Sequence, residues 1–90
     1  MYVESAELRF YIPHAFTLKD KRQILRSLTD KTRRRFNVSI AETGTQDLPK
    51  TITIGVAVVS GDYAHAGKML ENIIRFMEEH TEGDLTEVIR

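Results

Sequence analysis

The 90-residue sequence contains no cysteine. This absence excludes disulfide bonds, thiolate zinc sites, iron–sulfur clusters and cysteine nucleophiles, and it is compatible with a reducing compartment. Long apolar runs are missing as well, because the apolar stretch of residues 1–12 is interrupted by Glu4, Glu7 and Arg9. We therefore expect neither a signal peptide nor a membrane span, no membrane partner, and a cytoplasmic location.

Sequence motifs of the common catalytic and cofactor sites are also missing. The chain has no Walker loop, no dinucleotide-binding GxGxxG sequence and no GxSxG nucleophile turn. Its three histidines, His14, His65 and His80, are not spaced like the zinc ligands of an HxxxH motif. We therefore expect no metal, no cofactor and no enzymatic activity.

The composition is that of a small folded domain. Hydrophobic residues make up 41% of the chain and charged residues 29%, which is too apolar for intrinsic disorder. At this length, folding buries roughly 64% of the surface that the unfolded chain exposes. The sequence thus predicts a single domain over residues 1–90 that needs no metal or disulfide for stability.

Hydrophobic periodicity predicts three strands and two helices in a definite order. Apolar and polar residues alternate over residues 4–12, 37–43 and 51–60, which is typical of half-buried strands. Apolar residues recur every three or four positions over residues 18–35 and 63–80, which indicates amphipathic helices. Thr17 followed by Asp20 resembles a capping box and marks the start of the first helix. Residues 85–90 form either a last edge strand or a frayed tail.

This order predicts a ferredoxin-like βαββαβ fold of the α+β class. Both apolar helix faces can then cover one face of a four-stranded antiparallel sheet. Right-handed crossovers place the third strand between the first and the second, and the fourth strand outside the first. The predicted core contains Leu8, Phe10, Ile24, Leu28, Ile54, Val56, Leu70 and Ile73.

Charge is distributed unevenly along a chain whose formal net charge is zero. Between Thr17 and Phe36, eight cations face two carboxylates, a net charge of +6, whereas the stretch from Glu71 to the end carries −4. A basic helix of this kind can bind the phosphates of RNA with little sequence preference. The cations predicted to contact phosphate are Lys19, Lys21, Arg22, Arg26, Arg33, Arg34 and Arg35.

Two other interpretations of these features remain open. The basic residues can simply form a solvated helix face. Alternatively, the chain is a small homodimeric interaction or regulatory module with no nucleic-acid role. Its dimer would form through the small residues Thr53, Gly55 and Ala57 on the sheet face away from the helices, or through pairing of basic and acidic helices. Base stacking on that sheet face is not expected, because Tyr11 is its one aromatic residue in the prediction and no GxxG loop is present.

The sequence also resembles a known family. The strings TLKDKRQILRSL, RRRFNVSIAE and TITIGVAVVSGD are similar to those of the YlxP-like family of small bacterial proteins, whose function is unknown. The residues that match the family pattern are Leu18, Lys19, Lys21, Arg22, Arg35, Phe36, Asn37, Val38, Glu42, Asp47 and Ser60. The resemblance implies a ferredoxin-like fold. Genes of this family often lie beside genes for translation initiation and ribosome maturation, which implies an association with RNA or a ribosomal particle.

Overall fold

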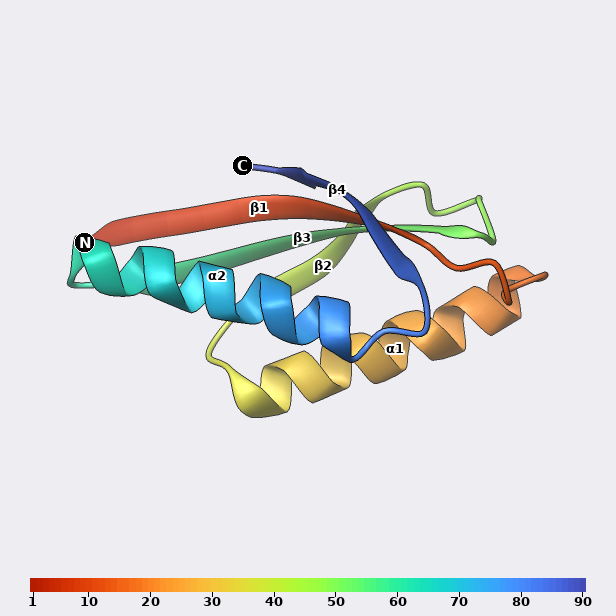
Figure 1. Cartoon of the computed structure of the whole chain (residues 1–90), viewed down its shortest axis with the longest axis horizontal. Helices are drawn as coiled ribbons and strands as arrows, with labels where there is room; N and C mark the ends of the chain where they lie inside the picture. The colour runs from red at the N-terminus through yellow and green to blue at the C-terminus, as the bar shows by residue number, and fades with distance from the viewer.

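The computed structural model describes residues 1–90 and contains six elements in the predicted order (Figure 1). They are β1 (Tyr2–Tyr11), α1 (Leu18–Arg35), β2 (Ser39–Gly44), β3 (Thr51–Ser60), α2 (Tyr63–Glu79) and β4 (Asp84–Ile89). Residues 84–89 thus form a strand, which decides between the two alternatives for the end of the chain. Neither helix is both long and apolar enough to cross a membrane.

The four strands form one antiparallel sheet with the order β2-β3-β1-β4, as predicted. The two central strands, β1 and β3, pair along ten residues each, and Leu8 lies opposite Ile54. β4 pairs with β1 through a register shift between Arg9 and Phe10. The shorter strands β2 and β4 are the two edges of the sheet, so each has one side without a strand partner.

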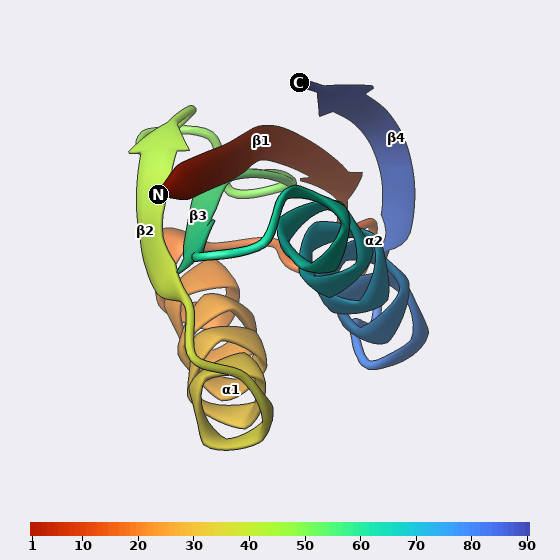
Figure 2. The same ribbon diagram turned by 90° about the vertical axis from the view of Figure 1, so that its left-hand side faces the viewer.

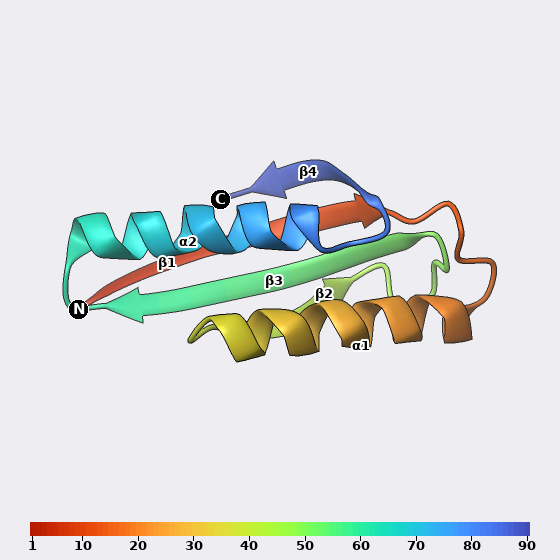
Figure 3. The ribbon, with the colours of Figure 1, turned by 60° about the horizontal axis from the view of Figure 1, so that its bottom comes forward.

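Both helices lie on the same face of the sheet (Figure 2). They run in opposite directions along its long axis (Figure 3). The opposite face of the sheet is covered by no other element. The predicted ferredoxin-like arrangement is therefore confirmed.

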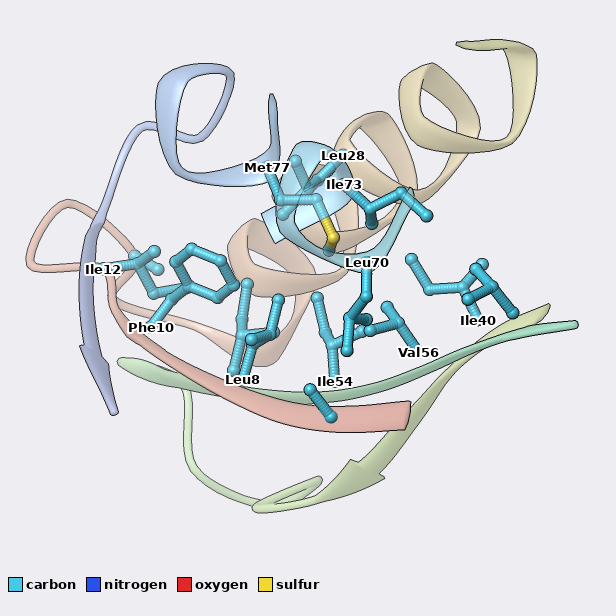
Figure 4. Close-up of a cluster of buried hydrophobic side chains, with 14 residues drawn as sticks. Leu8, Phe10, Ile12, Leu28, Ile40, Ile54, Val56, Leu70, Ile73 and Met77 are labelled. Atoms are coloured by element: carbon cyan, nitrogen blue, oxygen red, sulfur yellow. The ribbon is translucent and has the colours of Figure 1, made fainter. Parts of the chain in front are cut away.

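The core lies between the sheet and the helices (Figure 4). Seven of the eight predicted core residues are buried. The exception is Ile24, which is half-buried and packs at the margin of the core. The reason is its place on α1, where Lys21, Leu28 and Thr32 are buried and follow one another at intervals of seven and four residues. This spacing defines the line along which α1 meets the sheet, and Ile24 lies beside that line.

The start of α1 is fixed by the predicted capping box. The Thr17 hydroxyl accepts a hydrogen bond from the Asp20 backbone N–H at 3.1 Å. In return, the Asp20 carboxylate accepts hydrogen bonds from the backbone N–H groups of Phe16 and Thr17, at 3.0 and 3.1 Å. These backbone hydrogen bonds, that from Phe16 first, lower the pKa of Asp20 below its ordinary value. The cap thereby fixes the residue at which α1 begins.

Leu28 supplies a direct test of the core. It is the apolar residue of α1 that is fully buried against the sheet. Leu28→Ala removes buried methyl groups and leaves a cavity, so we expect the free energy of unfolding to fall by about 2–5 kcal/mol. Chemical denaturation measures this loss, with the exposed neighbour Ser27→Ala expected to change stability by less than about 0.5 kcal/mol. A loss below about 1 kcal/mol for Leu28→Ala would place this side chain outside the core.

Candidate nucleic-acid interface

Lys21 is not on the exposed face of α1. Its side chain is 2% exposed, and its ammonium group lies 3.0 Å from Oε2 of Glu42 on β2. The same Nζ donates hydrogen bonds to the carbonyl oxygens of Thr45 and Leu48 in the β2–β3 loop. Position 21 precedes Leu28 by seven residues, so the helix turns it toward the sheet. The expectation that Lys21 contacts phosphate is therefore wrong, because its buried ammonium group is already ion-paired with Glu42 and hydrogen-bonded to two loop carbonyls.

Three other predicted cations line one groove between α1 and the edge strand β2. These are Arg22, Arg26 and Arg33, and the groove has a volume of about 410 Å³. Their spacings of four and seven residues align them along about 16 Å of the helix axis, at 1.5 Å per residue. Leu25 and Ile40 contribute the aliphatic part of the lining. We call this feature the arginine groove.

The arginines of the groove have no carboxylate partner. The chain contains two ion pairs in all, Lys21–Glu42 at 3.0 Å and Arg9–Glu87 at 3.1 Å. Two carboxylates line the groove, Asp30 and Glu42, but Glu42 is neutralised by Lys21. Three guanidinium groups against the one remaining carboxylate leave the groove with a net charge of +2.

The remaining three predicted cations lie outside the arginine groove. Lys19 and Arg34 are exposed and do not line it. Arg35 lies on the side of α1 that approaches α2, with its guanidinium carbon 5.9 Å from the ring centroids of both Phe36 and Phe76. The structure thus brings together three of the seven predicted residues, places three elsewhere on the surface and buries one.

The strand side of the groove was not anticipated from the sequence. The interpretation treated the basic helix as an isolated surface, whereas β2 forms the second wall through Ile40, Ala41 and Glu42. One signal for this pairing was present. Glu42 follows Ile40 by two residues and so lies on the same, helix-facing side of β2. A carboxylate on the helix-facing side of the sheet needs a cation beside it, and Lys21 is the cation that pairs with Glu42.

The open sheet face has no aromatic surface for stacking bases. Its polar side chains bind one another, with the Thr43 hydroxyl donating to Glu7 at 2.8 Å. A shallow depression surrounds Gly55, where a Cβ atom would lie 2.7 Å from the Thr43 methyl group. Tyr11 lies at the end of β1, away from this depression. The chain also has no cluster of three or more histidine, aspartate or glutamate side chains able to hold a metal ion.

Comparisons with known proteins agree with this architecture. The fold is similar to that of the de novo designed protein LFR1 1, which has a ferredoxin fold, with a TM-score of 0.64 and 19% identity over 100% of this chain and 86% of that one. The chain thus has a ferredoxin-like fold. Residues 3–90 match the family described as "Protein of unknown function (DUF503)", and the chain belongs to this family.

A curated relative carries the name that the sequence motifs suggested. The uncharacterized protein YlxP of Bacillus subtilis strain 168 is 33% identical over 81 residues, which cover 90% of this chain and 88% of that protein. The resemblance to YlxP-like proteins is therefore confirmed. Neither description names an activity or a ligand, so the function has to be argued from the site itself.

The buried ion pair makes its own prediction. Lys21→Met leaves the Glu42 carboxylate and two loop carbonyls without their donor. Breaking a fully buried pair costs about 3–5 kcal/mol, and because the Glu42 side chain is 22% exposed we expect about 2–3 kcal/mol here. The double variant Lys21→Met/Glu42→Gln should regain part of this loss, because no buried charge remains unpaired. Denaturation measures both, and unchanged stability in Lys21→Met would contradict a structural role for this lysine.

Proposed function

We propose that this protein binds RNA phosphates through the arginine groove, with further contacts from Lys19 and Arg34 on α1. The observation that carries the proposal is the alignment of three arginines in one groove without a carboxylate ion pair. Phosphate oxygens would provide the missing acceptors, because the planar guanidinium group can donate two parallel hydrogen bonds to a phosphate. Lys19 and Arg34 would add contacts on the exposed side of the helix.

The distribution of the acidic residues supports an orientation for this binding. The stretch from Glu71 to the end carries −4, and Glu78 and Glu79 are exposed on α2. Phosphates would therefore approach the α1 side of the molecule and be repelled from the α2 side. The implied link of the family to translation favours RNA as the polyanion and a ribosomal particle as its source. Co-sedimentation with ribosomal particles from a low-salt lysate would test that source.

Charge reversal in the groove tests the proposal. Arg22→Glu/Arg26→Glu should weaken binding of a fluorescein-labelled RNA hairpin at least tenfold, measured by fluorescence anisotropy, because two phosphate contacts become repulsive. For the unmodified protein with four phosphate contacts on a duplex stem, log K against log salt should slope near −4, at about 0.9 per phosphate.

Two control variants separate the groove from the overall charge. Lys31→Glu/Lys68→Glu makes the same change in net charge at exposed positions outside the groove, so it should weaken binding far less. Glu78→Lys/Glu79→Lys should preserve or strengthen binding, because it removes repulsion. Unchanged affinity in Arg22→Glu/Arg26→Glu would identify the basic helix as a solvated face and refute the proposal.

We also propose a second candidate function, that of a homodimeric interaction module built on the open sheet face. The observation that favours it is an exposed apolar pair on the two central strands. Val3 and Val59 lie opposite each other and are 59% and 52% exposed. Ala57, next along β3 on the same face, adds a small side chain against which a second sheet could pack.

A single substitution tests the second candidate. Ala57→Arg places a long cation in the centre of the proposed contact while pointing away from the core, so dimers should become folded monomers. Light scattering measures the mass and circular dichroism the fold. An apolar contact should also persist at 1 M salt, whereas pairing of charged helices should weaken as the Debye length falls from about 10 Å at 0.1 M to about 3 Å. A monomer at every protein and salt concentration would remove this candidate.

A further inference from the structure

We infer that the arginine groove holds an unpaired nucleotide of single-stranded RNA, with a base that carries an amino group, rather than the backbone of a duplex. This inference rests on the proposed function and specifies its ligand. Three features of the groove lead to it, namely its lining, its edge strand and its one free carboxylate.

The lining is not that of a purely electrostatic surface. Leu25 and Ile40 give the groove an aliphatic part between the arginines, and its volume of about 410 Å³ is in the range of small-ligand pockets. The backbone of a duplex presents only sugars and phosphates, and its bases are stacked inside. A single strand can turn a base outward and place its flat face against aliphatic groups or a guanidinium plane. The aliphatic lining therefore favours an unpaired base.

The strand wall supplies hydrogen-bonding groups for such a base. β2 is an edge of the sheet and pairs only with β3. Arg33 Nη2 donates to the Ile40 carbonyl oxygen at 2.9 Å, so this carbonyl points away from β3 and toward α1. The N–H and C=O of one residue in an antiparallel strand point to the same side, and the pattern repeats at every second residue. The N–H groups of Ile40 and Glu42 therefore point outward at the groove, where a base edge can accept from them.

Asp30 distinguishes between a phosphate and a base. It is exposed in the groove and forms no ion pair, so its carboxylate repels a phosphate placed beside it. The same carboxylate accepts hydrogen bonds from an exocyclic amino group, as acidic side chains do with cytosine N4. Arg22 and Arg26, one helical turn apart, are the groups left for the phosphate. The groove thus fits a nucleotide whose base carries an amino group, and it fits uracil less well.

Three RNA probes test this assignment at pH 7.5 by anisotropy: a single-stranded C12, a single-stranded U12, and a 12-base-pair RNA duplex. We expect C12 to bind about tenfold tighter than the duplex, and about fivefold tighter than U12 because one hydrogen bond is lost. Asp30→Asn should strengthen U12 binding while abolishing the preference for C12. A simple gain of positive charge would instead strengthen all three probes equally.

Failure of this inference can be told apart from failure of the proposed function. If the duplex binds as tightly as C12 and Asp30→Asn strengthens every probe equally, the single-strand assignment is overturned while phosphate binding stands. If none of the three RNAs binds in a salt-dependent way, both are overturned.

Amide hydrogen exchange provides an independent readout of the strand wall. C12 should slow exchange at the Ile40 and Glu42 amides, whereas the duplex should leave both unchanged. A 12-residue poly-glutamate peptide serves as the matched polyanion and should not protect them. If the peptide protects these amides as strongly as C12, the groove binds an extended acidic peptide by strand addition and the assignment to RNA is overturned.

Discussion

One buried ammonium group fixes helix α1 to the edge of the sheet. Lys21 reaches from the helix to the Glu42 carboxylate on β2 and to the carbonyl oxygens of Thr45 and Leu48 in the loop that follows. This one ammonium group therefore joins α1 to β2 and to the loop that directly follows β2, both of which lie 21 or more residues further along the chain. Because a buried ammonium without partners is costly, these contacts restrict how α1 can lie relative to β2. Because Glu42 also lines the arginine groove, the same contact joins the strand wall of the groove to α1.

The same ion pair determines the charge of the groove. Glu42 lies in the groove wall, and without Lys21 its carboxylate would face the arginines and compensate one of them. Lys21 binds this carboxylate from the buried side, so the guanidinium groups of Arg22 and Arg26 remain without an ion-pair partner. The charges are thus arranged as a neutral Lys21–Glu42 pair inside the protein and an excess of arginine cations in the groove. The lysine that we expected to bind phosphate instead makes phosphate binding by its neighbours possible.

The fold follows from the sequence more completely than the site does. Strand alternation around Leu8 and Phe10, together with the Thr17 and Asp20 cap, defines elements, and crossover handedness then orders the strands. The arginine groove could not be predicted in the same way, because helical periodicity shows which residues share a helix face but not which strand lies opposite that face. Lys21 illustrates the difference. It lies in line with Leu28, seven residues further on, yet a lysine is buried only where partners are available, and its partners lie 21 or more residues away in the sequence.

The two proposed surfaces meet at β2 without obstructing each other. Ala41 of β2 lines both the depression on the open sheet face and the arginine groove. A dimer formed through the open faces would therefore leave both grooves accessible. A two-fold symmetric dimer would present two arginine grooves. Once one groove had bound a strand of RNA, the second groove would encounter the same RNA molecule at a raised effective concentration. Weak binding by a single short groove would then become strong binding to longer single strands, so self-association and RNA binding would act together rather than as alternatives.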